Sequence, residues 1–308
     1  MSDDLETPPI ADMRCGFVAV IGAPNAGKST LINYMVGSKV AIVSHKVQTT
    51  RSTLRGIAIF GNSQVIFIDT PGIFAPKRRL DRAMVKQAWS GAGDADFVML
   101  LVDARKGVDD ETRAIVEGLS ELKRDIFLIL NKIDLVERES LLKLTEELSG
   151  MYEFKDVFMI SALKGDGVDD LKKHLEENSQ PGPWHYPPDQ ISDAPKYFIA
   201  AEITREKLFL RLHDELPYAS TVETETWEDK ADGSIRIEQV IFVIRDSQKP
   251  IVIGKNGQTI RAIGSDARAE LSEIFGCKVH LFLFVKVRSK WGDDPARYRA
   301  MGLDFPRE

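Results

Sequence analysis

The first half of the chain alternates between short apolar runs and longer segments with helical spacing. The apolar runs are FVAVIG, QVIFID, FVMLLVD, IFLILN and VFMISA. Segments such as STLINYMVG, DRAMVKQAW and VDDLKKHLEE separate them, with apolar positions three and four residues apart. Strands that are apolar throughout and alternate with helices indicate a mostly parallel sheet with helices on both faces. The pattern therefore predicts an α/β domain over residues 14–180.

A different pattern follows residues 181–195, a proline-rich stretch that we interpret as a linker because its prolines exclude regular structure. Beyond it, the segments REKLFLRLHDEL, STVETETWE and RIEQVIFVIRD indicate a helix and two strands. A short apolar helix ending at IVIGKNG, the helix QTIRAIGSDARAELSEIFG and the strand KVHLFLFVKVR complete the order. We expect an α+β domain of order α-β-β-α-α-β over residues 196–308, and a disordered tail over residues 1–13.

The composition limits which kinds of partner the protein can bind and in which cellular compartment we expect it. The chain has 308 residues and a formal net charge of -6, so a nucleic acid would have to meet a local basic patch. Cys15 and Cys277 match no metal-binding spacing, which indicates reduced thiols. The acidic start MSDDLETPPI lacks the features of a secretory signal, and no apolar run approaches membrane-spanning length. We therefore expect a cytoplasmic protein.

The stretch GAPNAGKS, residues 22–29, fits the phosphate-loop pattern G-x-x-x-x-G-K-[ST] between a predicted strand and helix. Gly22 and Gly27 would let the backbone curl so that its N–H groups point at phosphate oxygens. Lys28 would reach the β- and γ-phosphates, and the Ser29 hydroxyl would bind Mg²⁺. A chance glycine-rich turn is the alternative, and the loop by itself fits an ATPase, a kinase or a GTPase.

Two later motifs bear on that choice. DTPG, residues 69–72, ends an apolar strand, so the Asp69 carboxylate can hold Mg²⁺ through water and the Gly72 N–H can meet a γ-phosphate. NKID, residues 131–134, follows the predicted strand IFLILN. The Asp134 carboxylate can accept two hydrogen bonds from guanine that adenine cannot offer. Each motif alone also fits an ordinary polar turn, and their order along the chain favours a guanine-nucleotide site.

Neighbouring residues have supporting roles in this interpretation. Asn131 would brace the loops, and the stem of Lys132 would cover the face of the base. The triplet Ser161-Ala162-Leu163 ends the following strand and can supply a backbone N–H to guanine O6. The predicted GTP-binding residues are Gly22, Ala23, Pro24, Asn25, Ala26, Gly27, Lys28, Ser29, Thr30, Asp69, Thr70, Pro71, Gly72, Asn131, Lys132, Asp134, Ser161, Ala162 and Leu163.

These motifs resemble those of the translation-factor-related GTPases over about residues 17–180. The resemblance implies a GTP/GDP switch with Mg²⁺, in which loops over residues 40–56 and 72–91 respond to the γ-phosphate. It also implies that a threonine of the stretch QTTR completes the Mg²⁺ shell with Ser29 and Asp69, and it favours Thr50 over Thr49. A solvated threonine-rich loop is the alternative for this stretch.

The residue after DTPG is Ile73, where Ras-like GTPases carry a glutamine that orients the attacking water. Isoleucine cannot do this, so intrinsic hydrolysis is expected to be slow or assisted. In related GTPases an asparagine at the position of Asn25 helps to bind K⁺, which suggests K⁺ as a further cofactor. The alternative for Asn25 is a turn-forming role. The predicted catalytic residues are Lys28, Thr50, Gly72 and Asn25.

The second Gly-Lys stretch, IVIGKNG, has only two residues between its glycines, Gly254 and Gly257, and lies between two predicted helices. This G-x-x-G form, together with the order of elements, resembles the type II KH domain, whose loop clamps single-stranded RNA. A glycine-rich helix-to-helix turn is the alternative. The predicted RNA-binding residues are Ile253, Gly254, Lys255, Asn256, Gly257, Arg261, Lys286 and Arg288.

A GTPase domain, a linker and a KH domain together resemble the Era family, with agreement at CGFVAVIGAPNAGKSTLIN, VQTTR, DTPGI, NKID, ELPY, VIGKNG and VKVRSKW. The resemblance implies a monomeric GTPase that binds near the 3′ end of 16S ribosomal RNA and assists assembly of the 30S subunit. It also leaves open peripheral association with the cytoplasmic face of the inner membrane. The alternative function is a membrane-peripheral signalling GTPase whose C-terminal domain docks a protein.

Overall fold

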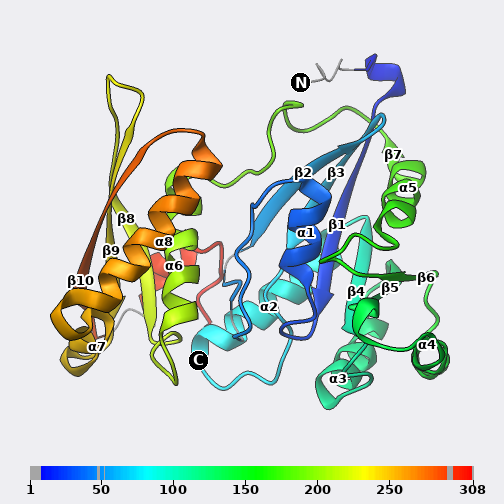
Figure 1. Cartoon of the computed structure of the whole chain (residues 1–308). Helices are drawn as coiled ribbons and strands as arrows, with labels where there is room; N and C mark the ends of the chain where they lie inside the picture. Colours follow the sequence, from blue (N-terminus) through cyan, green and yellow to red (C-terminus); the bar gives the residue numbers. More distant parts are fainter. Residues whose placement is uncertain (1–7, 47–48, 52, 290–293, 307–308) are drawn as a thin grey trace. The chain divides into compact units, whose positions relative to one another are not determined.

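The computed structural model of the protein describes residues 8–46, 49–51, 53–289 and 294–306. These residues form two compact units (Figure 1). The first takes its described residues from Met1–Ala41, Thr50–Asp193 and Met301–Glu308, and the second from Ile42–Thr49 and Ala194–Ala300. Residues 1–7 of the expected tail lie outside the described residues, while Ile10–Asp12 form a 3-10 turn, η1. Within the described ranges, no helix has the length and apolar character needed to span a bilayer.

The first unit is built on one sheet. Its strands are β1 (Arg14–Gly22), β2 (Leu54–Phe60), β3 (Ser63–Asp69), β4 (Phe97–Asp103), β5 (Asp125–Asn131), β6 (Asp156–Ile160) and β7 (Gln180–Pro181). The strand order is β2-β3-β1-β4-β5-β6, and the short β7 pairs with the start of β1. All pairings from β3 to β6 are parallel, whereas β2 and β7 run antiparallel to their neighbours. Parallel strands are buried on both faces, and β3 and β4 have no exposed residue.

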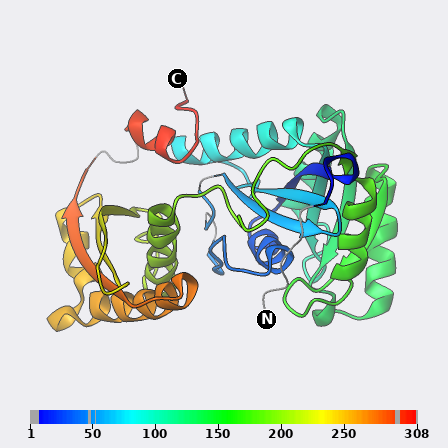
Figure 2. The same cartoon turned by 90° about the horizontal axis from the view of Figure 1, so that it is seen from above.

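Helices cover both faces of this sheet. The helical segments of the unit are α1 (Lys28–Val36), α2 (Arg79–Asp94), α3 (Asp110–Gly118), η2 (Leu119–Glu121), η3 (Ile133–Leu135), α4 (Arg138–Met151) and α5 (Val168–Asn178). Apolar residues of α2, α3 and α4 share one core cluster with alternate positions of β1, β4 and β5. In Figure 2 the blue α1 and the cyan α2 lie on opposite sides of the sheet.

The second unit has a three-stranded sheet of order β10-β9-β8. Its elements are α6 (Lys196–Arg211), β8 (Ser220–Asp229), β9 (Ile235–Val243), η4 (Asp246–Gln248), α7 (Lys249–Ile253), η5 (Lys255–Gly257), α8 (Gln258–Phe275), β10 (Val279–Val287) and α9 (Pro295–Ala300). Strand β9 pairs parallel with β10 and antiparallel with β8. Ile241 and Val285 of the sheet pack with Phe209 of α6 and Ile263 of α8, so these helices cover one face of the sheet.

The predicted fold class is confirmed: a mostly parallel sheet between helices precedes an α+β unit of order α-β-β-α-α-β. Two local expectations were wrong. The strand β2 was not predicted, and its first three residues, 54–56, lie within the loop over residues 40–56 that was expected to respond to the nucleotide. Helix α6 begins at Lys196, directly after Pro195, and ends at Arg211 rather than extending to Leu216. A proline just before a helix suits its fixed backbone angle, which marks the true start.

Candidate functional site

The predicted nucleotide motifs come together at the carboxyl ends of the parallel strands. The phosphate loop follows β1, DTPG follows β3, NKID begins at the end of β5, and Ser161-Ala162-Leu163 follows β6. In open α/β sheets, ligands bind at this edge. The first two motifs are in direct contact, since a Cβ on Gly72 would lie 3.0 Å from the Pro24 Cα, and the Ile73 N–H donates to the Gly22 carbonyl at 3.1 Å.

The phosphate loop closes around the ammonium group of Lys28. Its Nζ donates to the carbonyls of Gly22 at 3.0 Å and Ala23 at 2.9 Å, and the side chain is only 6% exposed. Burial lowers the pKa of Lys28 to about 8, although the nearby Asp69 carboxylate opposes this shift. Gly27 has a φ of 105°, and a Cβ there would lie 2.2 Å from Asn131 Nδ2, so no larger residue fits. The loop is therefore compact, with a buried cation at its centre.

Three side-chain oxygens converge beside this loop. The hydroxyls of Ser29 and Thr50 lie 3.1 Å apart, and they donate to Asp69 Oδ2 at 3.1 and 3.2 Å respectively. The Thr49 hydroxyl points elsewhere, since it donates to the Lys46 carbonyl at 2.6 Å and lies 2.7 Å from Ser44 Oγ. Two hydroxyls and a carboxylate form the kind of oxygen cluster that Mg²⁺ prefers, so the residues present fit this ion.

Asn131 connects the loops at the other side of the site. Its Nδ2 donates to the Ala26 carbonyl at 2.8 Å, and its Oδ1 accepts from the backbone N–H groups of Lys132 at 2.8 Å and Ala162 at 2.9 Å. The side chain is 2% exposed. One amide therefore ties the phosphate loop, NKID and the segment after β6 together, as expected from the sequence.

Lys132 is held by a residue that the sequence reasoning missed. Its Nζ donates to the Asn25 carbonyl and to Asp103 Oδ2, both at 2.6 Å. Burial opposes ionisation of Asp103, but hydrogen bonds from Arg105 and Lys132 lower its pKa to about 2. Asp103 ends the run FVMLLVD, and an aspartate at the end of a buried strand, as in QVIFID, was the available signal.

Asp134 lies beside the end of β6. The Ser161 hydroxyl donates to its carboxylate and, with the Lys164 ammonium 3.5 Å away, lowers the pKa of Asp134. The N–H of Ser161 donates to the Asp166 carbonyl. Because the Ala162 N–H donates to Asn131, Leu163 has the remaining N–H of the predicted triplet, and its side chain is exposed.

The other predicted residues of the site have simpler surroundings. Ala23 and Ala26 are buried in the phosphate loop, and Thr30 lies in the first turn of α1. The Thr70 hydroxyl donates to the Val20 carbonyl at 2.7 Å, which fixes the start of DTPG on β1. Asn25 is exposed at the tip of the loop with a φ of 64°. Its side chain is therefore accessible from the solvent side of the site.

The G-x-x-G loop lies in the second unit, between α7 and α8. Gly254 has a φ of 75°, and a Cβ there would lie 2.2 Å from Thr259 Oγ1. Lys255 and Asn256 at the tip are exposed, and Arg261 donates to the Asn256 carbonyl. The structure thus brings Arg261 together with the loop.

Lys286 and Arg288, also predicted to bind RNA, lie on or after β10. Lys286 alternates with Val285 and Val287, which pack toward α8, so it projects from the opposite face of the sheet. There its Nζ donates to Glu225 at 2.8 Å. The Arg288 guanidinium lies 3.4 Å from Asp294 and 5.7 Å from the Phe242 ring centroid. Their cationic heads are therefore engaged with acidic partners rather than with the G-x-x-G loop.

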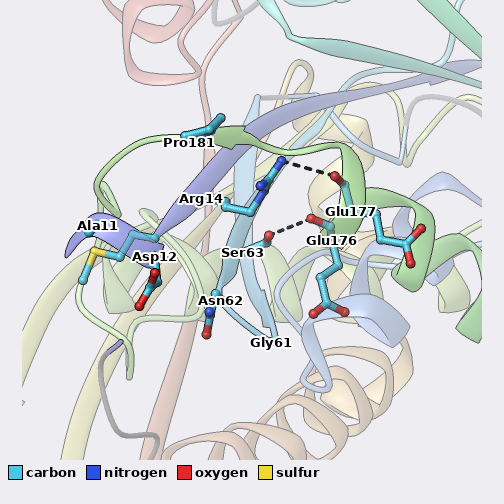
Figure 3. Close-up of a pocket in the computed structure, with 10 residues that line it drawn as sticks. Ala11, Asp12, Arg14, Gly61, Asn62, Ser63, Glu176, Glu177 and Pro181 are labelled. Carbon is cyan, nitrogen blue, oxygen red and sulfur yellow. Dashed lines mark hydrogen bonds between the residues drawn. The ribbon is translucent and has the colours of Figure 1, made fainter. Parts of the chain in front are cut away.

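A cavity of about 610 Å³ lies elsewhere in the first unit, at the amino end of β1 (Figure 3). The Arg14 guanidinium donates to the carbonyls of Ser179 at 2.8 Å and Glu177 at 3.3 Å, and Ser63 Oγ donates to the Glu176 carbonyl at 2.9 Å. None of the predicted site residues lines this cavity. These hydrogen bonds connect the end of α5 to the first residues of β1 and β3, so we interpret the residues around the cavity as structural.

Fold and site define a phosphate-loop nucleotide-binding unit joined to a KH unit. The family described as 50S ribosome-binding GTPase matches residues 17–132, and the KH domain family matches residues 215–292. The chain is 62% identical over 308 residues to GTPase Era of Bradyrhizobium sp. strain BTAi1, covering 100% of both chains. It is 62% identical over 294 residues to GTPase Era of Rhizobium meliloti, covering 96% of this chain and 94% of the relative. The chain belongs to the Era family of GTPases.

Solved structures of Era agree over both units. One, of Era in complex with MgGDPNP and nucleotides 1506–1542 of 16S ribosomal RNA, is 36% identical with a TM-score of 0.89. A second, of an Aquifex aeolicus Era variant bound to GDP·AlF4⁻, gives the same identity and TM-score. Each comparison covers 94% of this chain and 99% of the other.

Proposed function

We propose that this protein is a GTP-hydrolysing switch that binds the 3′ region of 16S ribosomal RNA and assists maturation of the 30S subunit. The observation that carries the nucleotide half is the convergence of Ser29, Thr50 and Asp69 beside the phosphate loop. The RNA half is supported by the G-x-x-G loop and by the related Era that was crystallised with both MgGDPNP and 16S RNA.

In the proposed site the chain contacts the phosphates from two sides. The loop's N–H groups and Lys28 meet the β- and γ-phosphates, and the Gly72 N–H meets the γ-phosphate. Lys28 would exchange its bonds to the carbonyls of Gly22 and Ala23 for bonds to phosphate oxygens. Ser29 and Thr50 would hold Mg²⁺ directly and Asp69 through water, and the ion would neutralise charge developing between the phosphates.

The base would lie between Lys132 and the segment after β6. The Asp134 carboxylate, kept ionised by Ser161 and Lys164, would accept two hydrogen bonds from guanine. The Leu163 N–H would meet guanine O6. Adenine would leave the carboxylate without donors, which is the physical basis of the proposed preference for GTP.

The position after DTPG carries isoleucine rather than a glutamine that could orient water, and the Ile73 side chain is buried in the apolar core of the unit. We propose that K⁺, bound with the help of Asn25, supplies the missing positive charge near the β- and γ-phosphates. The exposed position of Asn25 at the tip of the loop allows this. Turnover should be faster in KCl than in NaCl at equal ionic strength, and the difference should disappear in Asn25→Ala. Equal rates in the two salts would remove the idea.

The RNA would meet the second unit at the loop of residues 254–257. Close approach of the backbone at Gly254 and the exposed Lys255 suit a sugar-phosphate chain. Ile253 and Arg261 border this loop, while Lys286 and Arg288 would have to leave Glu225 and Asp294 to join it. We assign the domain roles accordingly: nucleotide chemistry to residues 14–180 and RNA contact to residues 196–308.

The competing function is a membrane-peripheral signalling GTPase whose C-terminal domain docks a protein. Crosslinking of bound RNA in cells separates the two. We expect wild-type crosslinks at the 3′ end of 16S RNA in 30S precursors, and their loss in Gly254→Asp. Crosslinks that persist in this variant would overturn the assignment of the loop, and an absence of 16S crosslinks in the wild type would favour the competitor. A cytoplasmic monomer is the expected form.

A further inference from the structure

The last residues of β4 and β5 lie side by side at the edge of the sheet where the nucleotide motifs meet. Asp103 ends β4 and is paired in the parallel ladder with Asn131, the last residue of β5, and the Ala104 N–H donates to the Asn131 carbonyl at 2.9 Å. Lys132 is the next residue along the chain. The register of the two strands therefore brings the Asp103 carboxylate within reach of the Lys132 side chain, although 29 positions separate them in sequence.

Lys132 leaves β5 with a left-handed backbone. Its φ is 67°, and Asn25 at the tip of the phosphate loop has a φ of 64°. Residues other than glycine disfavour this conformation, so other contacts have to stabilise it. Lys132 Nζ donates to the Asn25 carbonyl at 2.6 Å, and a Cβ added at Gly27 would lie 4.0 Å from Lys132 Cε. The lysine therefore lies along the phosphate loop and connects two strained backbone positions.

The carboxylate of Asp103 fixes the direction of the lysine. Lys132 Nζ donates to Asp103 Oδ2 at 2.6 Å, and the Asp103 side chain is 3% exposed while that of Lys132 is 22% exposed. Arg105 holds the carboxylate in turn: its backbone N–H and its Nε donate to Oδ1, both at 3.1 Å, and its Nη2 donates to Oδ2 at 2.8 Å. Hydrogen bonds between charged groups are stronger than neutral ones, and buried pairs are screened less by salt. The carboxylate is therefore a fixed anchor for the ammonium group.

An anchored lysine has a consequence for ligand binding. Its long side chain has several rotatable bonds, so ordering it costs conformational entropy. If the nucleotide had to order the side chain, that cost would weaken binding, whereas a side chain ordered on folding avoids it. Of the two acceptors around Lys132 Nζ, only Asp103 carries a full opposite charge. Removing that charge leaves the neutral Asn25 carbonyl to hold the ammonium group, so the stem becomes less ordered.

We propose that Asp103 is a positioning residue for guanine-nucleotide binding, which holds Lys132 so that its stem forms one wall of the base site before the nucleotide arrives. Arg105 supports this role by fixing the carboxylate. The inference rests on the proposed function, in which Lys132 covers the face of the base. Asp103 acts through Lys132 and not on the nucleotide itself, so it contributes to GDP and GTP binding alike. All the residues in this chain of contacts belong to the first unit.

The test measures binding of fluorescent mant-GDP to the full chain in Mg²⁺. In Asp103→Asn we expect the Kd to rise about tenfold, as for a lost hydrogen bond between charged groups. Lys132→Met keeps an apolar stem without the ammonium group and should weaken binding by a similar factor. Adding Asp103→Asn to Lys132→Met should then change the Kd by less than about twofold, because the partner is already absent. Asp125→Asn is the matched control, since Asp125 pairs with Lys155 at the amino end of β5 and should leave the Kd unchanged.

The double variant makes the outcome decisive. If Asp103→Asn binds normally, or if the factors of the two single variants multiply, the inference is wrong while the proposed function stands. If Lys132→Met binds mant-GDP as tightly as the unaltered protein, the assigned base site itself is wrong and the role of Asp103 falls with it.

A further variant applies if Asp103→Asn fails to fold. Arg105→Met loosens the carboxylate from a position that is 48% exposed. The Kd for mant-GDP should then rise severalfold when Lys132 is present and stay unchanged in the Lys132→Met background. An unaltered Kd with Lys132 present, or an equal rise in both backgrounds, would overturn the inference.

Discussion

Two short loops in this chain pair glycine with lysine, and they place the lysine in opposite surroundings. In the first, Lys28 is 6% exposed and donates to the carbonyls of Gly22 and Ala23. In the second, Lys255 is exposed at the tip of a helix-to-helix turn. Four residues separate the glycines of the first loop and two those of the second. The longer loop can enclose a small anion, whereas the shorter one can only approach an extended one.

The difference shows that the dipeptide itself carries little information. What distinguishes the loops is the element before each one and the burial that follows. The first loop follows a buried central strand of the sheet, so its lysine is surrounded by protein and is desolvated. The second loop follows a five-residue helix, α7, and its lysine is exposed to solvent. A desolvated lysine suits a small anion bound in fixed geometry, and a solvated one suits a long polyanion bound through counterion release.

Removing the buried lysine should have the largest effect. In Lys28→Ala we expect GTP turnover to fall roughly 100-fold or more, because a preorganised charge at the phosphates is lost. Phosphate release under saturating GTP measures this. RNA binding without nucleotide should be unchanged, and Lys255→Ala is the matched control with normal turnover. Full turnover in Lys28→Ala would overturn the assigned site.

Changing the second loop should weaken RNA binding and leave GTP turnover intact, the reverse of the effect expected for Lys28→Ala. In Gly254→Asp a Cβ would meet Thr259 Oγ1 at 2.2 Å, and the carboxylate would repel phosphates. We expect affinity for an RNA of the 16S 3′ sequence to fall about tenfold or more, measured by fluorescence anisotropy, with GTP turnover retained. If RNA affinity and GTP turnover both fell in this variant, the two loops would not have the separate roles that we assign to them.

The pKa of Lys28 predicts a pH dependence that only the first loop should show. With a pKa of about 8 in the free protein, Lys28 is charged below that pH and loses its proton above it. Bound phosphates favour the charged form, so binding takes up a proton above pH 8. Affinity for mant-GDP should be constant below about pH 8 and fall above it, approaching tenfold per pH unit. A flat profile from about pH 7 to 9 would contradict the burial argument.

We expect the smallest effect, on the salt dependence of RNA binding, from replacing the exposed lysine of the second loop. Lys255→Ala removes one cation from a solvated loop, so the slope of log affinity for RNA against log salt should decrease by about 0.7. Anisotropy titrations at several KCl concentrations measure the slope. An exposed lysine replaced outside the second unit, Lys123→Ala, should leave the slope unchanged. An unaltered slope in Lys255→Ala would place Lys255 away from the RNA backbone.

The sequence predicted features that depend on local spacing and missed those that depend on what lies nearby in space. The strand-loop-helix context of Gly22–Ser29 and the order of elements around Gly254 were both visible in the pattern. The strand β2 was not, because its edge position leaves Arg55 exposed and Gly56 interrupts the apolar run. Asp103 was missed because its partner, Lys132, is distant in sequence.

The hydrogen bonds of Asn131 have a thermodynamic consequence. Because one buried side chain holds Ala26, Lys132 and Ala162 at once, the base end and the phosphate end of the site are ordered together. Loop entropy that would otherwise be lost on binding has already been lost on folding. A ligand therefore meets a single rigid receptor rather than two that must be assembled, and the chain retains that order each time product leaves.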